Sequence, residues 1–397
     1  MNTRIAKPPK PASPQCKALT RILLGGLIAA FWSYSSAMAQ APGARTAAKF
    51  LILDDCDTDF RTPPFEDAAL VFDANGKALR KLGDLNICQT VGGCRALSLA
   101  ADGRVFVICQ NVADKLAAYE TDTGKRLWGI DGKFNSATIS PAGAIYALTS
   151  TGTIYGDKTL IVNQRGQIVK EAKVGGFDLV LDSGREALWI VGKKITKCDL
   201  DLNLLLEADG ISWCAVSVDV DAEHSVWVAE RQHPNVAQSR NRILKIAPGG
   251  WTKKVVDLKL DPFCLRVDRA DGSVWVTGIE VRPQLTERVL DSIEKRSGRL
   301  EIGKGARDLL TKPHVLYKTQ KYDASGMLLH EIDHGGHSLD IDQADRSVWI
   351  AGDKVYHYSS KGAALSRFTG VSVEQKYIAV VPEWARNNQT NAPPGSR

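Results

Sequence analysis

The sequence lacks several features that would assign a function quickly. It has no C-x-x-C pair, no P-loop and no G-x-S-x-G turn. After Trp32 it has no long apolar run. These absences argue against a zinc ribbon, a covalent haem site, a nucleotide-phosphate loop of that type, a hydrolase nucleophile elbow and a later membrane-spanning helix. The information lies instead in the N-terminal leader, positions 1–39, and in a repeat that follows it.

The leader has the composition of a secretory signal peptide. Five basic residues and no acid precede or flank an apolar run from Ile22 to Trp32, and Ala37-Met38-Ala39 stands before Gln40. A basic start, a short apolar centre and an A-x-A end are typical of a cleaved export signal. We therefore expect a periplasmic or secreted protein with no membrane span after cleavage; an uncleaved anchor helix is the alternative.

The charge of the rest of the chain is nearly balanced. The leader holds five of the 51 basic residues, which leaves 46 basic residues against 45 acidic ones. A chain without a basic excess is not expected to bind nucleic acid. We expect a monomer.

A regular repeat runs through positions 40–384. In six segments a short apolar strand is followed, after a turn with Asp or Gly, by a strand centred on an aromatic residue. The first-strand anchors are Leu97, Ala137, Leu179, Val216, Leu265 and Leu339, and the aromatics that follow them at a nearly constant spacing are Phe106, Tyr146, Trp189, Trp227, Trp275 and Trp349. Two further alternating segments follow each pair, so the unit predicts a four-stranded antiparallel blade of an all-β propeller.

The two ends of the repeat region predict one more blade. The segment from Lys49 resembles a second strand and the one from Leu70 a third and fourth, whereas the segment around Ile378 resembles a first strand with nothing after it. Together they form a closing blade built from both termini, which gives seven blades; if Ile378 belongs to no blade, the number is six. Closing the ring removes free sheet edges. Residues 385–397 are expected to be a disordered tail.

The repeats resemble those of NHL-type and YVTN-type propellers and of streptogramin lyase-like propellers. The matching phrases are DGSVWVTG from Asp271, RSVWIAG from Arg346 and FDANGKALRKLG from Phe72. The resemblance implies a propeller fold, and such folds carry enzymes, receptors and scaffolds alike. His337 stands where lyase-like repeats often have His, but the neighbouring Pro and Gly and the full set of lyase catalytic residues are missing.

The strand directions predict one functional face. The residues that enter the first strands should surround one end of the central channel; they are Arg95, Asn135, Phe177, Trp213, Phe263 and His337. Three long loops should open on the same face, at Asp54 to Asp67, at Glu230 to Asn241 and in an insertion around 279–313 that contains Glu280 and Arg282. We expect these residues to bind the ligand. Tolerated insertions and aromatics that merely plug the channel are the alternatives.

One motif suggests a metal and is rejected in its usual form. His330 to His334 reads H-E-x-x-H, but it falls on a predicted fourth strand, where residues four apart lie about 13 Å from each other. Such a pair cannot share one zinc ion. A divalent metal held by His334, His337 and a ligand from another blade stays open as an alternative, as does a pair of ordinary surface histidines.

Seven cysteines follow the leader, an odd number that leaves at least one thiol without an internal partner. Cys88 and Cys94 close a short loop and are a possible disulfide. Three functions result: an exported binding propeller for a small molecule, glycan or protein, a metal-assisted lyase or lactonase-type enzyme, and a redox protein using cysteines on the functional face. The missing catalytic set favours the first.

Overall fold

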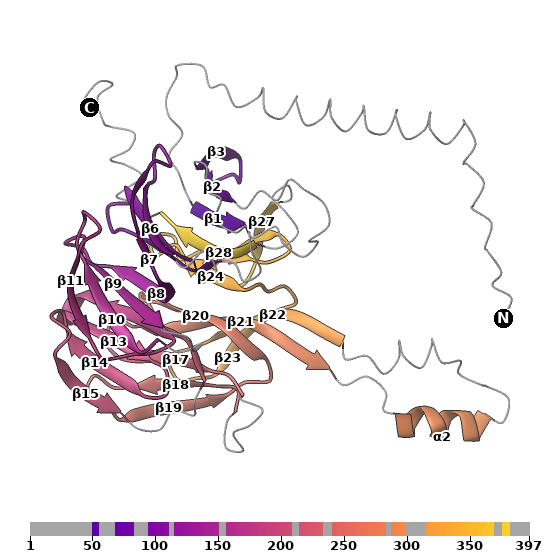
Figure 1. Ribbon diagram of the computed structural model, residues 1–397. Coiled ribbons are helices and arrows are strands. Elements are labelled where there is room, and N and C mark those ends of the chain that lie inside the picture. Colours follow the sequence, from indigo (N-terminus) through magenta and orange to yellow (C-terminus); the bar gives the residue numbers. More distant parts are fainter. Residues whose placement is uncertain are drawn as a thin grey trace, which may run out of the picture. The chain divides into compact units, whose positions relative to one another are not determined.

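Figure 1 shows the computed structural model of the chain, which describes residues 50–54, 68–82, 94–110, 115–150, 156–208, 214–232, 240–282, 287–297, 314–368 and 375–381. All of these residues belong to the unit Thr46–Arg397. The predicted signal peptide, residues 1–39, and the predicted tail, residues 385–397, lie outside the described residues.

The described strands form seven four-stranded antiparallel sheets. In the first half of the chain, from the inner to the outer strand, the sheets are β4 (Cys94–Leu99), β5 (Val105–Gln110), β6 (Lys115–Glu120), β7 (Arg126–Asp131); β8 (Lys133–Ile139), β9 (Ile145–Ser150), β10 (Lys158–Val162), β11 (Ile168–Ala172); and β12 (Asp178–Asp182), β13 (Ala187–Val191), β14 (Ile195–Asp199), β15 (Leu204–Ala208).

The second half continues the series with three sheets and the closing sheet. They are β16 (Ala215–Val220), β17 (Val226–Glu230), β18 (Arg242–Ile246), β19 (Thr252–Asp257); β20 (Asp261–Asp268), β21 (Ser273–Arg282), β22 (His314–Tyr322), β23 (Leu328–Ile332); β24 (Ser338–Ile341), β25 (Val348–Ala351), β26 (Val355–Tyr358), β27 (Ala364–Phe368); and β28 (Gln375–Val380), β1 (Phe50–Asp54), β2 (Ala68–Phe72), β3 (Ala78–Leu82). The predicted propeller of four-stranded antiparallel blades is confirmed.

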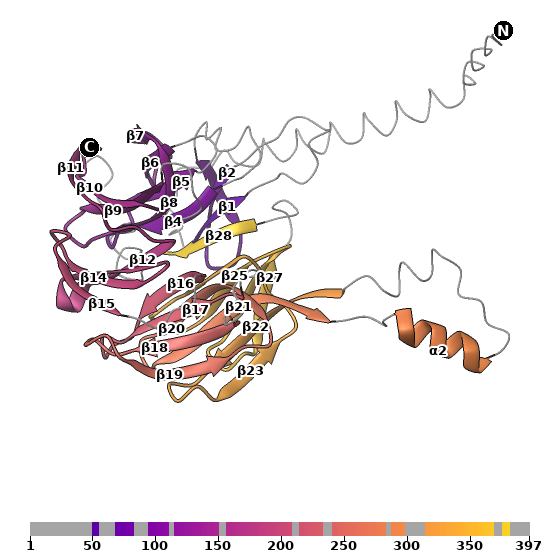
Figure 2. The same ribbon diagram turned by 60° about the horizontal axis from the view of Figure 1, so that its bottom comes forward.

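The closing sheet joins the two ends of the sequence. The C-terminal strand β28 pairs with the N-terminal strand β1, with Ile378 opposite Ile52 and Val380 opposite Phe50. In Figure 2, β28 in yellow lies beside β1 in indigo. Each inner strand also neighbours the inner strand of the next sheet, and β28 neighbours β4. The predicted blade made from both termini is therefore present, and the inner strands close a ring.

Buried aromatic residues hold neighbouring sheets together. Tyr146, Trp189, Trp227, Trp275 and Trp349 lie in the second strands of five sheets, and each packs in a cluster with the sheet that follows. The four tryptophans are fully buried. Burying an aromatic side chain contributes about 2 to 3 kcal/mol, so this repeated contact is a main source of the stability of the ring.

Phe106 departs from the sequence prediction. It packs with Leu51 and Val71 of the preceding sheet, whereas its neighbour Val107 faces the following one. Successive side chains of a strand point to opposite faces, so the alignment of Phe106 with the other five aromatics was wrong by one residue. Val107, paired with Ser98, holds the equivalent position.

The insertion begins later than the sequence suggested. Strand β21 continues through Glu280 to Arg282 and pairs with β22 from Val274 to Arg282, so residues 279–282 are strand and not loop. The insertion contains the charged helix α2 (Glu287–Ser297), with Lys295 and Arg296 in its last turn, where the helix dipole favours basic side chains. Within the described part of the chain, no helix is both long and apolar enough to cross a membrane.

Candidate functional site

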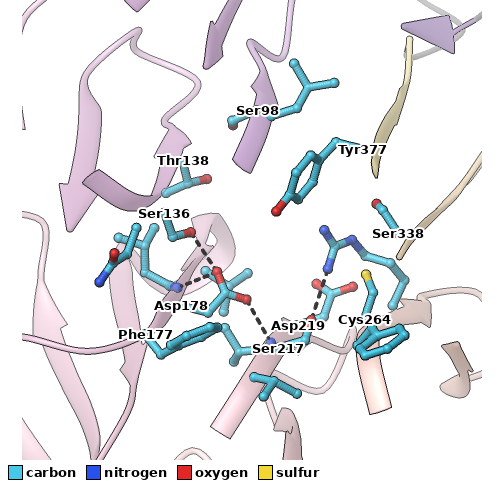
Figure 3. Close-up of a pocket in the computed structure, with 18 of the residues that line it drawn as sticks. Ser98, Ser136, Thr138, Phe177, Asp178, Ser217, Asp219, Cys264, Ser338 and Tyr377 are labelled. Atoms are coloured by element: carbon cyan, nitrogen blue, oxygen red, sulfur yellow. Dashed lines mark hydrogen bonds between the residues drawn. The ribbon is translucent and has the colours of Figure 1, made fainter. Parts of the chain in front are cut away.

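A cavity of about 520 Å³ lies where the seven inner strands meet (Figure 3). Every inner strand contributes residues to its wall, from Leu97 and Ser98 of β4 to Tyr377 and Ile378 of β28. A cavity of this size holds a small molecule of moderate size. Because all seven strands contribute, the site requires the closed ring and no single sheet can form it.

Four of the predicted rim residues line this cavity. They are Asn135, Phe177, Phe263 and His337, each within the first three residues of an inner strand or just before it. Trp213 lies outside the described residues, and Arg95 is described only as backbone of β4. Four of the side chains selected from strand direction therefore line one cavity, and their role in ligand binding stays a prediction.

The rim carries a stack of rings on one side. The Phe263 and His337 rings lie 5.1 Å apart and nearly parallel, and the ring of Tyr317 meets His337 edge-on at 5.7 Å. The guanidinium of Arg231 lies 5.4 Å from the Phe263 ring, while its Nε donates to Asp261 Oδ2 at 2.8 Å. An arginine held over an aromatic face is a favourable cation–π contact, so Arg231, Phe263 and His337 support one another.

Inward-facing residues of the inner strands form two layers in the wall. The layer nearer the rim contains Ser136, Asp178, Ser217, Cys264 and Ser338, all of which line the cavity. Asp178 is the only acid among them. Its Oδ1 accepts hydrogen bonds from Ser136 Oγ at 2.6 Å and from the Leu179 amide at 2.9 Å, and its Oδ2 accepts one from the Val218 amide at 3.1 Å. Figure 3 shows Asp178 beside Ser136 and Ser217.

The deeper layer lies two residues further along each strand. It consists of Ser98, Thr138, Val180, Asp219, Arg266 and Asp340, which pair across to the second-strand residues Val107, Tyr146, Trp189, Trp227, Trp275 and Trp349. Arg266 therefore stands between two acids of neighbouring sheets. Its Nε lies 4.0 Å from Asp340 Oδ1, and its Nη1 donates to the Leu265 carbonyl at 2.8 Å.

Three carboxylates of these layers bridge adjacent sheets by the same contact. One oxygen of each accepts the amide of the next residue in its own strand, and the other accepts an amide of the following inner strand. The acceptors and the second donors are Asp178 with Val218 at 3.1 Å, Asp219 with Val267 at 2.9 Å, and Asp340 with Val380 at 2.8 Å. These acids thus connect the sheets, and two of them, Asp178 and Asp219, also line the cavity.

The wall shifts the acid–base behaviour of its ionisable groups. Burial raises the pKa of Asp178 and of Asp340. The shift is partly opposed by Arg266 and backbone amides at both, and at Asp178 first by the hydrogen bond from Ser136. Burial alone would lower the pKa of Arg266, but Cys264, Asp219, Asp340 and Asp178 outweigh it and the pKa is raised. Arg266 therefore stays a cation, and its field reaches Asp178 in the other layer.

Glu280 and Arg282, predicted to bind the ligand, lie on β21, and Glu280 is not among the residues that line the cavity. The Glu280 carboxylate is 2.9 Å from Lys318 Nζ. Lys318 is nearly fully buried and also contacts Glu331, and the hydrogen bonds that it donates to Glu331 and Glu280 raise its pKa. Of Arg282 only the backbone is described, opposite His314. A role for either residue in binding stays a prediction.

The two histidines considered for a metal have separate surroundings. His334 Nδ1 lies 3.0 Å from the Tyr358 hydroxyl and its ring contacts Tyr356, whereas His337 contacts the rings of Phe263 and Tyr317. No three His, Cys, Asp or Glu side chains gather as metal ligands in the described ranges. His330 and Glu331 lie in the fourth strand β23, as the sequence predicted, so the H-E-x-x-H segment is not helical.

The cysteines separate into core and cavity positions. Cys109 and Cys198 are fully buried between sheets, and burial raises the pKa of Cys198 to about 11 and that of Cys109 further. Cys264 lines the cavity with its Sγ 3.7 Å from the Leu339 carbonyl. The Cys88–Cys94 disulfide falls outside the described residues, since Cys88 is not described and Cys94 is described only as backbone.

Sequence reasoning missed the charged residues inside the channel. Asp178, Asp219 and Arg266 occupy inward positions of inner strands, whereas the predicted site contained only residues that enter those strands. The signal was present: an acid or a base at a position that alternation places inside a ring is unusual. Tyr377 was missed because its strand was defined only by the anchor Ile378.

Comparisons with known proteins support the fold only. No family model matches the sequence, and no curated protein matches it. Among solved structures, Kuenenia stuttgartiensis hydrazine synthase matches with a TM-score of 0.55 and 11% identity over 77% of this chain and 97% of that one. A functionally unknown protein from Desulfotomaculum acetoxidans DSM 771 matches with a TM-score of 0.55 and 10% identity over 85% and 99%. At such identities the similarity supports a β-propeller and carries no function.

Proposed function

We propose that this protein is an exported binding protein that takes a small polar molecule into the cavity at the centre of its propeller. The observation that carries the proposal is the cavity itself, of about 520 Å³ and lined by all seven inner strands. Its wall supplies hydroxyl groups, two carboxylates and a guanidinium, and its rim supplies aromatic rings. A concave site with a few convergent polar groups and apolar walls is the usual form of a small-molecule site.

The wall favours a small molecule over a protein or a long glycan. The polar groups lie inside the ring, on the deeper parts of the inner strands, with Thr138, Asp219 and Arg266 two residues further in than Ser136 and Asp178. A partner must enter the channel to reach them. The metal-assisted lyase or lactonase remains the alternative, but His334 and His337 contact different aromatic partners, which gives it no support.

A substitution that fills the cavity tests this proposal. Thr138 lines the cavity and is half-buried, so Thr138→Trp places an indole in the channel. Purified protein is screened for thermal stabilisation by a library of sugars, polyols, amino acids and organic acids. A compound that stabilises the wild type and fails with Thr138→Trp supports the proposal.

The matched control is Thr252→Trp, which adds the same ring to an exposed position of the outer strand β19. It is expected to keep the response. Equal stabilisation of the wild type and of Thr138→Trp would overturn the assignment to the channel. If Thr138→Trp fails to fold, Ser98→Phe narrows the same cavity from another sheet.

The proposal includes export, a seven-bladed ring and the resemblance to NHL-type and YVTN-type repeats. Export rests on the leader, and we propose cleavage before Gln40. The blade number rests on the seven sheets and on the contact of β28 with β4. N-terminal sequencing of protein recovered from the periplasm or medium tests the first of these; an intact Met1 on exported protein would contradict it.

A further inference from the structure

The cavity wall carries opposite charges on three neighbouring sheets, with Asp178 and Asp219 on two of them and Arg266 on the third, and Arg266 does not use all of its hydrogen-bond donors within the described part of the chain. Arg266 Nη1 donates to the Leu265 carbonyl at 2.8 Å and lies 3.5 Å from Ser217 Oγ. Its Nε is 4.0 Å from Asp340, beyond hydrogen-bond distance, and its Nη2 makes no hydrogen bond within the described part of the chain. A guanidinium presents its donors as a planar fork that matches a carboxylate.

Of the two acids in the cavity wall, Asp178 lies one layer nearer the rim than Arg266. Asp178 lines the cavity and, among the described residues, its Oδ2 accepts a hydrogen bond from the Val218 amide alone, while Ser217, the residue before Val218, lies next to Arg266. Asp178 and Arg266 thus flank Ser217 from two sides. Asp219 lines the cavity as well, in the same layer as Arg266.

The balance of charge decides which ligand fits. A simple anion would meet Arg266 but also the carboxylates of Asp178 and Asp219, which repel it. A simple cation would meet those acids but would leave the Arg266 donors unused and repel its charge. A molecule with both charges satisfies each group, because like charges then meet opposite ones at both ends.

We propose that the ligand is a small zwitterion of the free α-amino acid class, with its carboxylate on Arg266, its ammonium group on Asp178 and Asp219, and its side chain towards the rings of Phe177 and Phe263. This inference rests on the proposed function and specifies the substrate class of the same site. The hydroxyls of Ser136, Ser217 and Ser338 supply further contacts along the wall. The aromatic rim favours a side chain with an apolar or aromatic surface.

Matched ligands test the inference without any change to the protein. Binding of each proteinogenic L-amino acid to the mature protein is measured by calorimetry, and the best one is compared with its N-acetyl derivative and its carboxamide. The first derivative lacks the ammonium group and the second lacks the carboxylate. Each derivative is expected to bind about 100-fold more weakly, since each loses a charged hydrogen-bonded contact in a confined site.

The variants assign each charge to its partner. Arg266→Gln should abolish the preference for the free acid over the carboxamide, and Asp178→Asn the preference for the free amine over the N-acetyl form. Arg185→Gln, at an exposed position, and Asp342→Asn, at a buried position in the turn after β24, are the controls and should keep both preferences. Retained preferences in the first pair would overturn the assignment of the charges.

The outcomes separate this inference from the proposed function. Sugars or polyols that bind in the cavity while no amino acid does would overturn the zwitterion and leave the binding function standing. Equal affinity for the amino acid and both derivatives would do the same. Binding that survives Thr138→Trp would overturn the channel site and, with it, both proposals.

Discussion

The two ends of the inner strands use aspartate in different ways. At the turn end, Asp221 accepts the Glu223 and Ser225 amides and the Trp227 indole, and Lys245 Nζ lies 2.9 Å away. Asp268, also at a turn, is held by Arg346 Nε at 2.8 Å. At the cavity end, the carboxylates of Asp178 and Asp219 accept hydrogen bonds from backbone amides and also line the central cavity, as Arg266 does.

This difference suggests separate roles, with the aspartates at the turn end stabilising the fold and those at the cavity end available for binding. A buried carboxylate that is paired with a lysine or arginine of the protein stabilises the fold and is not available to bind a ligand. The pKa values follow this division. Burial alone would raise the pKa of Asp271, at a turn, but hydrogen bonds from Ser273 and Arg346 outweigh burial and lower it. Burial dominates for Asp178 in the cavity wall and raises its pKa.

The largest loss of stability is expected from removing β28, the strand that closes the ring, because the cavity end and the turn end of the inner strands are both formed only in the closed ring. Deleting residues 374–397 removes β28 and with it the buried side chains of Ile378, Val380 and Val381. The neighbouring sheets would expose apolar faces, so no cooperative thermal transition is expected by circular dichroism. Deleting only residues 385–397 is the control and should melt like the full chain. An unchanged melting temperature after the longer deletion would contradict the closed ring.

Breaking an ion pair at the turn end should damage the fold and spare the cavity. Arg346→Ala leaves the fully buried Asp268 without its cation and is expected to lower the free energy of unfolding by about 2 to 3 kcal/mol. Urea unfolding measures the loss. The exposed neighbour Arg269 is the control, since Arg269→Ala should change it by about 0.5 kcal/mol or less. A loss of ligand affinity in Arg346→Ala would show that the two ends are not independent.

The pH dependence of stability should have opposite signs at the two ends. The folded state holds the Asp178 proton more tightly than the unfolded state does, so this stabilisation is present below the unfolded pKa of about 4 and is lost as pH rises through the raised folded pKa. For Asp271 the folded pKa is lowered, so its stabilisation is present above about pH 4 and is lost as pH falls.

Asp178→Asn and Asp271→Asn test this by urea unfolding from about pH 3 to pH 8. The advantage of the wild type over Asp178→Asn should shrink as pH rises, and its advantage over Asp271→Asn should grow. If the difference in unfolding free energy from the wild type changed with pH in the same direction for both variants, the proposed electrostatic difference between the two ends would be wrong.

The smallest effect concerns the cysteines and leaves the fold intact. Burial raises the pKa of Cys198 to about 11, so at pH 8 about one molecule in a thousand carries the thiolate that alkylation needs. Cys198 and Cys109 should stay unlabelled by iodoacetamide in the native protein and react in urea, as read by peptide mass spectrometry. Cys264 lines the cavity and should label slowly and be protected by the ligand. Faster labelling of Cys109 than of Cys264 would contradict the assignment of the accessible cavity to the region of Cys264.

The sequence by itself determined the fold and one end of the site. The aromatic at the centre of each second strand is a local feature repeated at a regular spacing, and burying it against the next sheet dictates a ring; Phe106 misled because adjacent positions of a strand face opposite sheets. Strand direction then placed Asn135, Phe177, Phe263 and His337 at the rim. Only the tertiary structure decided that Arg266 stands between Asp219 and Asp340 and near Asp178. These residues are far apart in the sequence, and it is the register between neighbouring inner strands, fixed by the packing of whole sheets, that sets which charges share one layer of the cavity.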